Sequence, residues 1–164
     1  MEAATRQAVG AMLGRIPSGI WIMTACDDDG RETGMLASWV QQAAFHPPTI
    51  TASVHRERFL NEWLTTTKRV SLSLLGKSHK DIVQHFGKGF KPDEKAFKGI
   101  KTVRGRNGLP ILKEALGWVE GVVRNSMTAG DHTVYLLEIE SAGLSAHEED
   151  EKPMVHLRKN GFHY

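Results

Sequence analysis

Hydrophobic residues near the start of the chain recur at roughly the spacing of one helix face. Within residues 2–16 this series consists of Ala4, Val9, Met12, Leu13 and Ile16. The chain then reaches Pro17-Ser18-Gly19, and proline cannot continue a helix because it lacks a backbone N–H. We therefore predict a short amphipathic N-terminal helix within residues 1–16.

Most of the remaining chain carries the patterns of β-strands. Residues 19–26 are apolar on both faces, and Asp27-Asp28-Asp29-Gly30 supplies a turn because aspartate and glycine tolerate left-handed backbone conformations. Residues 49–54 alternate polar and apolar positions, which is the period of a strand with one buried face. We also predict strands over residues 33–40, 70–74, 117–125, 132–139 and 154–158.

Two stretches between these strands return to helical spacing. Residues 57–66 bring Phe59, Trp63 and Leu64 to one face, and residues 77–86 show a similar period. Helices inserted between only some of the strands do not make the regular alternation of a parallel α/β fold. The sequence therefore predicts a mainly β protein, an antiparallel barrel in a single domain that spans residues 1–164. Ligands of such small barrels bind at the mouth or at a seam between subunits.

Composition and charge exclude several classes of function. The 164 residues carry a net charge of +2 with both signs interspersed, so no strong field favours nucleic acid or an acidic membrane surface. The longest apolar run is far shorter than the ~20 residues of a membrane helix. Cys26 is the single cysteine, which excludes an internal disulfide and fits a reducing compartment. We expect a cytoplasmic protein without nucleic-acid or membrane partners.

Motifs for nucleotides, metals and nucleophilic serines are absent from the sequence. No G-x-G-x-x-G follows a strand, and Ser71 stands where a P-loop ending at Gly76-Lys77-Ser78 needs its first glycine. The 8 histidines lack H-x-x-x-H or H-E-x-x-H spacing, and no G-x-S-x-G is present. His147-Glu148-Glu149-Asp150 belongs to a charge run typical of a solvated loop. We expect no resident metal.

Three local patterns remain as candidates for a ligand site. Residues 34–42 place small residues between large apolar ones, so a flat ring would fit against this backbone, although an ordinary core strand has the same pattern. His55-Arg56-Glu57-Arg58 opens a predicted helix and would suit a phosphate, or is simply a solvated helix start. Gly130-Asp131-His132-Thr133 would place an imidazole beside a ligand, or forms only a turn. The stretch Phe86-Gly87-Lys88-Gly89-Phe90-Lys91 would add an aromatic and basic cover.

Together these patterns resemble the flavin reductase-like family, whose members form an FMN-binding split β-barrel of antiparallel Greek-key type, usually as homodimers. The resemblance lies in residues 34–43, in Phe45-His46-Pro47-Pro48, in Val54 with the four residues after it, and in Gly130-Asp131-His132. Residues 110–115 and 156–164 are similar to the C-terminal flavin reductase domain of cyanobacterial flavodiiron proteins. The resemblance covers residues 16–164.

The resemblance implies a role for each pattern. The isoalloxazine ring would lie along Met35, Leu36, Ala37, Ser38, Trp39 and Val40. The ribityl chain and phosphate would be held by Ser53, Val54, His55, Arg56, Arg58 and Phe59. The catalytic residue would be His132, which would position the nicotinamide or move a proton. His163 and Tyr164 would pack across the seam of a homodimer.

The implied activity is hydride transfer from NADH or NADPH to FMN, with electrons passed to an acceptor protein that the sequence does not identify. Two alternatives stay open: an FMN-binding electron carrier without NAD(P)H reactivity, and a barrel that has lost flavin or holds another flat cofactor such as haem. His55 stands where the family often has lysine. The diiron and flavodoxin-like modules of flavodiiron proteins are absent from these 164 residues, so oxygen reduction at iron is not carried over.

Overall fold

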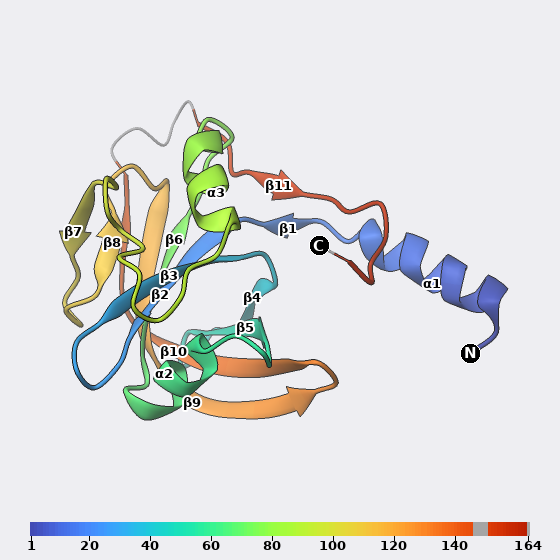
Figure 1. Ribbon diagram of the computed structural model, residues 1–164, viewed down its shortest axis with the longest axis horizontal. Coiled ribbons are helices and arrows are strands. Elements are labelled where there is room, and N and C mark those ends of the chain that lie inside the picture. The colour runs from blue at the N-terminus through green and yellow to red at the C-terminus, as the bar shows by residue number, and fades with distance from the viewer. Residues whose placement is uncertain (146–150, 164) are drawn as a thin grey trace.

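The centre of the molecule is a seven-stranded antiparallel sheet that curls into a barrel (Figure 1). The computed structural model describes residues 1–145 and 151–163. Along the sheet the strand order is β3-β2-β6-β9-β10-β5-β4. The strands are β2 (Trp21–Cys26), β3 (Glu32–Ala37), β4 (Val40–Ala44), β5 (Thr49–His55), β6 (Arg69–Leu74), β9 (Gly117–Ala129) and β10 (His132–Leu144).

Non-consecutive strands lie next to each other in this sheet, since β6 pairs with β2 and β10 pairs with β5. This order confirms the predicted mainly β, antiparallel Greek-key fold. Two helices lie against the barrel, α2 (Leu60–Thr66) and α3 (Lys80–Gly87), and a small hairpin joins β7 (Thr102–Arg104) to β8 (Pro110–Leu112). The hairpin was not predicted, because strands of three residues carry no readable alternation.

The two chain ends form a projection that we call the terminal arm. It consists of α1 (Ala3–Gly14), β1 (Ser18–Gly19), β11 (Val155–His156) and residues 157–163. Figure 1 shows β1 and β11 side by side, leading from the barrel to α1. The predicted N-terminal helix is therefore confirmed, and it lies beside the last residues of the chain.

The barrel is split beside β3. This strand and β4 are consecutive in sequence but lie at opposite ends of the strand order. The chain bends between them at Ser38-Trp39, where the carbonyl of Trp39 accepts a hydrogen bond from the N–H of Ser53 at 3.0 Å. Among the described residues, no ladder pairs β3 with β4 or β5. The prediction of one strand over residues 33–40 is wrong because the chain must cross from one sheet edge to the other.

Both faces of β2 are buried, which explains why residues 19–26 are mostly apolar, with Thr24 as a buried polar residue among them. Met23 and Ala25 belong to the core inside the barrel, which α2 closes with Leu64. Ile22 points to a second core, in which α3 packs Ile82 and Phe86 against the outside of the sheet. Because successive side chains of a strand point to opposite faces of the sheet, β2 contributes to both cores.

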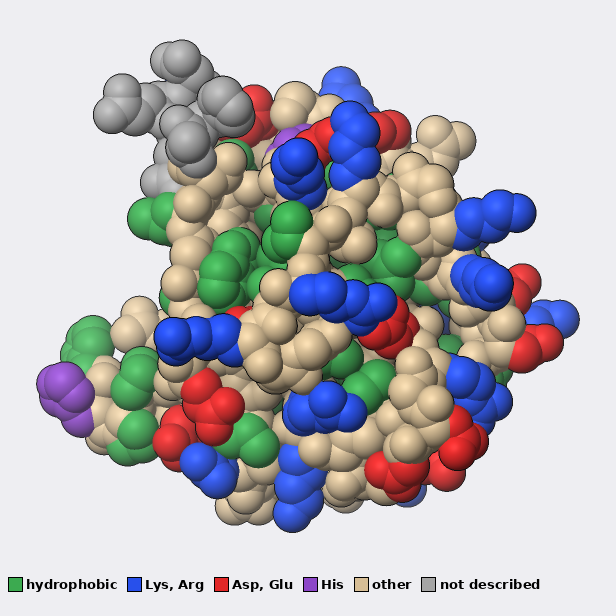
Figure 2. All heavy atoms as spheres, turned by 90° about the vertical axis from the view of Figure 1, so that its left-hand side faces the viewer, with side chains coloured by type: hydrophobic (Ala, Val, Ile, Leu, Met, Phe, Trp, Pro, Cys, Tyr) green, Lys and Arg blue, Asp and Glu red, His purple; other side chains and the backbone are tan. Residues whose placement is uncertain are grey.

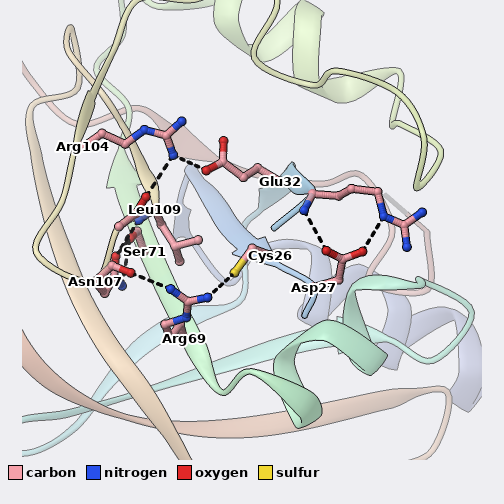
Figure 3. A network of polar contacts seen from close by, with 10 residues as sticks. Cys26, Asp27, Glu32, Arg69, Ser71, Arg104, Asn107 and Leu109 are labelled. Atoms are coloured by element: carbon pink, nitrogen blue, oxygen red, sulfur yellow. Dashed lines mark hydrogen bonds and ion pairs between the residues drawn. The ribbon is translucent and has the colours of Figure 1, made fainter. Parts of the chain in front are cut away.

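Polar contacts hold the β7–β8 hairpin to the barrel (Figure 3). The side chain of Asn107 donates to the carbonyl of Val70 at 3.1 Å and accepts from the N–H of Leu109 at 3.0 Å. Arg69 donates to the Asn107 carbonyl and to the sulfur of Cys26. Cys26 is thus a buried residue within this structural network.

The helix predicted from residue 57 begins three residues later, at Leu60. The intervening residues form a turn instead, in which the N–H of Arg58 bonds the carbonyl of His55 at 3.0 Å. The side-chain amide of Asn61 donates to the carbonyls of His55 and Arg58 at 2.9 and 2.7 Å. These bonds satisfy backbone groups outside a helix, as asparagine side chains commonly do in turns.

No helix within residues 1–145 and 151–163 is long and apolar enough to cross a membrane. The predicted loop at His147–Asp150 lies outside the described residues, as does Tyr164. On the side of the barrel that carries β7 and β8, acidic and basic side chains are intermixed (Figure 2).

Candidate functional site

A cavity of about 530 Å³ opens at the split of the barrel. Its lining includes nine of the residues that were predicted to hold a ligand: Met35, Leu36, Ala37, Ser38, Trp39, Ser53, His55, Arg58 and Phe59. The remaining lining residues are Thr33, Gly34, Glu57, Leu60, Phe86, Gly87, Gly89 and Phe90. The sequence patterns at residues 34–39 and 53–59 therefore meet in one place, although 13 residues separate them along the chain.

The first wall of the cavity is β3, an edge strand that pairs with β2 on one side only. Every second residue of an edge strand turns its N–H and C=O away from its single partner. These backbone groups are donors and acceptors for the polar rim of a flat ligand, while Met35 and Leu36 supply apolar surface. Of the predicted segment 34–42, residues 34–39 line the cavity, whereas residues 40–42 belong to β4 and do not.

The second wall comes from α3 and the residues after it. An ideal Cβ at Gly34 would lie 2.5 Å from the ring of Phe86 and 3.0 Å from that of Phe97, so only glycine allows α3 to approach β3 this closely. At Gly89 the chain turns with φ of +72° and returns Phe90 to the cavity. Residues 86–91 were expected to cover a ligand but were not among the predicted binding residues; Phe86, Gly87, Gly89 and Phe90 line the cavity.

Arg58 supplies positive charge to the lining of the cavity. A Cβ placed on Gly89 would lie 3.2 Å from an Nη atom of Arg58, so the guanidinium lies against the end of α3. Asn61 holds the turn that carries this arginine, and its amide oxygen accepts a hydrogen bond from Tyr135 at 2.8 Å. Burial of Tyr135 raises the pKa of its hydroxyl, which keeps this donor protonated.

Three predicted binding residues do not line the cavity. Val40 and Val54 are buried in the core inside the barrel. Arg56 is exposed, and its N–H bonds the carbonyl of Asp131 at 2.9 Å. The expected anion site also lacks a helix beginning at residue 57, so an anionic ligand would depend on the side chain of Arg58.

His132 is buried behind the cavity, not on its lining. The centre of its ring lies 4.7 Å from that of Trp39 and 5.0 Å from that of His55, and both neighbours line the cavity. The Nδ1 atom of His132 lies 2.7 Å from a carboxylate oxygen of Asp131. This hydrogen bond is the main cause of a lowered Asp131 pKa, to which the charges of His132 and His55 add. The catalytic role of His132 stays a prediction.

Within the part of the chain that the structure describes, no three histidine, cysteine, aspartate or glutamate side chains converge as metal ligands. The cavity instead combines apolar and aromatic side chains, the free edge of β3 and two charged residues, Arg58 and Glu57. This combination suits an organic ligand that carries both a flat ring and an anionic group, which Arg58 would bind.

Comparison with known proteins agrees with this ligand chemistry. Residues 13–163 match the family model described as a flavin reductase like domain. A Synechocystis sp. relative, diflavin flavoprotein A 1, is 36% identical over 154 residues, which are 93% of this chain and 26% of that protein. A Nostoc sp. sequence named as a diflavin flavoprotein is 34% identical over 164 residues, 99% of this chain and 28% of its own length. The chain thus spans about a quarter of these relatives.

Solved structures share the fold. The styrene monooxygenase flavin reductase of Pseudomonas putida S12 superposes with a TM-score of 0.74 and 26% identity, covering 90% of each chain. The NADH:FAD oxidoreductase of Streptomyces globisporus has a TM-score of 0.81 and 22% identity, covering 90% of this chain and 86% of its own. At the latter identity the likeness concerns the fold alone.

Proposed function

Because this chain belongs to the flavin reductase-like family, we propose that it binds FMN in the cavity beside β3 and takes a hydride from NADH or NADPH. Electrons would pass from there to an acceptor protein. The observation that carries the proposal is the cavity itself, where an edge strand, aromatic side chains and Arg58 meet. The two sequence patterns on which the flavin assignment was based both line this cavity.

The residues present fit FMN. The flat ring would lie against Met35–Trp39, where backbone N–H and C=O groups of β3 lack a second strand partner. The phosphate would be held by Arg58, with Ser53 and His55 as further polar partners. Bound FMN would supply the redox chemistry, since its ring system accepts electrons as a hydride and releases them one or two at a time.

The protein's own contribution would be orientation and charge. Backbone donors of β3 would favour negative charge at the rim of the ring, because fixed dipoles in a cavity need no reorganisation. His132 packs against Trp39 and His55, which both line the cavity. It would act through these two residues, by holding their side chains in place. Phe86 and Phe90 would limit the access of water to the opposite side.

FMN is proposed over FAD because Arg58 is the basic residue that lines the cavity with an always-charged side chain, and FMN ends in one phosphate. A structural neighbour is an NADH:FAD oxidoreductase, so FAD has to be compared directly. Titration of the purified protein with FMN and with FAD, followed by flavin fluorescence, is expected to give the lower Kd for FMN. Equal or tighter binding of FAD would contradict the preference.

The reductase activity is tested by mixing the protein and FMN with NADH or NADPH in the absence of oxygen. Loss of the visible flavin absorption at a rate above that of free FMN is the expected result, and the faster nicotinamide identifies the donor. If the protein binds FMN but neither NADH nor NADPH causes the loss of absorption, the reductase activity is excluded. The electron-carrier function would then be the remaining candidate. A protein that binds neither flavin would overturn the whole proposal.

An electron carrier is the second candidate, and one observation favours it. His132, which was predicted to position the nicotinamide, does not line the cavity. A carrier needs the flavin site alone, and electrons would then enter and leave through partner proteins. The same anaerobic experiment separates the two candidates.

We also propose that the chain forms a homodimer through the terminal arm. Isolated helices of 12 residues are marginal in water, and the buried residues of α1 are only Gly10 and Gly14. The arm exposes large apolar side chains that its own barrel does not cover: Met12, Leu13, Ile16, Val155 and Leu157. A group of this kind is typical of a protein interface, and a second copy of the chain would cover it.

A further inference from the structure

Arg158, in the terminal arm, contacts a residue that lines the cavity. Its guanidinium carbon lies 5.0 Å from the ring centre of Trp39, in a cation–π contact. Trp39 lines the cavity, whereas Arg158 follows β11 in the terminal arm. A residue close to the C-terminus therefore lies against the wall of a site that is built from residues 33–90.

Arg158 is fixed in position by the terminal arm. Its N–H donates to the carbonyl of Gly14 at 2.9 Å, at the end of α1. Its guanidinium donates to the carbonyls of Gly161 and Leu13 at 3.2 and 3.4 Å. Because arginine presents several donors in a rigid fork, these bonds hold the cation in one orientation over the indole.

Trp39 is also held from other directions. Its carbonyl accepts the hydrogen bond from Ser53 that joins the two sides of the split, and its ring packs against His132. The residue lies in the bend between β3 and β4, outside any strand ladder, so side-chain contacts govern the position of its ring. Removing the cation would take away one of the contacts that fix the rotamer of this indole at the wall of the cavity.

We propose that Arg158 is a positioning residue for the flavin, which acts by holding the Trp39 indole in place, and that the terminal arm is thereby part of the flavin site. The inference rests on the proposed flavin binding. It assigns to Arg158, within the C-terminal segment that is similar to flavodiiron domains, the task of shaping a cavity wall. Loss of the arm would loosen this wall even where β3 and Arg58 are intact.

The first test uses the protein without flavin. In an amide and indole NMR spectrum, the Trp39 resonance is identified by its absence in Trp39→Leu, and Trp21, Trp63 and Trp118 serve as internal references. Arg158→Met is expected to shift or broaden the Trp39 indole signal and to leave the other three signals in place. Arg6→Met is the matched control, because Arg6 makes a cation–π contact in the same arm, over Phe162 at 4.5 Å.

The second test measures flavin affinity as a double-mutant cycle. Cation–π contacts are worth about 0.5–2 kcal/mol, so Arg158→Met should raise the Kd for FMN about 2- to 30-fold. Arg6→Met should change it less than about twofold, and Arg158→Lys should restore part of the affinity because the charge remains. In the Trp39→Leu background, Arg158→Met should have no further effect.

The outcomes separate this inference from the proposed function. A wild-type protein that binds no flavin overturns the proposed function. If the wild type binds FMN but Arg158→Met leaves both the Kd and the Trp39 signal unchanged, this inference alone is overturned. An equal loss of affinity from Arg158→Met with and without Trp39 also overturns it, because the arginine would then act by another route. Circular dichroism confirms that each variant is folded.

Discussion

Arg56 and Arg58 carry the same charge two positions apart, yet only Arg58 lines the cavity. The backbone N–H of Arg56 bonds the carbonyl of Asp131, whereas the carbonyl of Arg58 accepts a hydrogen bond from the side chain of Asn61 in the turn before α2. At the scale of single residues, the difference between these arginines is therefore the sharpest test of where the phosphate binds.

We expect Arg58→Gln to weaken FMN binding by about 1–3 kcal/mol, or roughly 5- to 150-fold in Kd, because a charge-assisted hydrogen bond to phosphate is lost. Arg56→Gln is the matched control and should leave the Kd within about twofold. Flavin fluorescence titration of both variants measures the effect. Similar losses in the two variants would show that the phosphate does not bind at Arg58 alone.

Asp131 gives a pH-dependent prediction at the same scale. The hydrogen bond with His132, together with the charges of His132 and His55, lowers the pKa of Asp131 from its ordinary 3.8. A lowered folded-state pKa adds stability that is complete above the unfolded value of 3.8 and disappears as the pH falls through the folded value. Asp131→Asn should therefore be less stable than the wild type at neutral pH.

Urea unfolding at a series of pH values measures this difference. The gap between wild type and Asp131→Asn should be present above pH 3.8 and should close as the pH falls below that value. Asp93→Asn, a change at an exposed aspartate, controls for the general effect of removing a carboxylate. A gap that stayed open in strong acid would mean that the carboxylate charge is not its source.

At the scale of elements, the cavity depends on how closely α3 approaches β3. A methyl group at Gly34 would overlap the ring of Phe86, and Phe86 is fully buried and cannot move into solvent. Gly87 lies on the same cavity, but a Cβ there meets nothing within 4 Å. Substitution by alanine can therefore be compared at Gly34, where the added methyl group meets a packed ring, and at Gly87, where it meets open space.

Gly34→Ala should lower the free energy of unfolding by about 1–3 kcal/mol, because overpacking forces the aromatic side chains off their preferred rotamers. Gly87→Ala should be neutral or stabilising by up to about 1 kcal/mol, since alanine restricts the unfolded chain. Chemical denaturation of the two variants without flavin provides the comparison. Equal stability of the two proteins would show that α3 can move away from β3 without cost.

At the scale of the whole molecule, the apolar side chains of the terminal arm remain exposed in a single chain. If a second copy of the chain covers them, the mass in solution should be that of a dimer. Sedimentation should give twice the 18.2 kDa of the chain, and Ile16→Glu with Leu157→Glu should shift the protein toward monomer because charges would enter the interface. Val103→Glu, at an exposed position on β7, should leave the mass unchanged. A wild-type monomer would contradict the proposed dimer.

Most elements and much of the site could be predicted because they depend on local pattern. Alternation at residues 49–54 and 70–74 predicted β5 and β6, and the small residues at 34–38 pointed to the strand that lines the cavity. The wrong predictions concern positions where contacts with distant parts of the chain determine the local structure. The bend at Ser38-Trp39 depends on a hydrogen bond from Ser53. Helix α2 begins later than predicted because a turn precedes it, and Asn61, which holds this turn, accepts a hydrogen bond from Tyr135.

The sequence by itself determined the class of fold, the family and the two segments that line the candidate site, because periodicity and local motifs can be read without knowing which residues are in contact. Only the tertiary structure decided that Arg58 and not Arg56 meets the cavity, that α3 forms its second wall, and that Arg158 lies against Trp39. These contacts join residues far apart in the chain. Their geometry follows from the packing of whole elements, which no local pattern encodes.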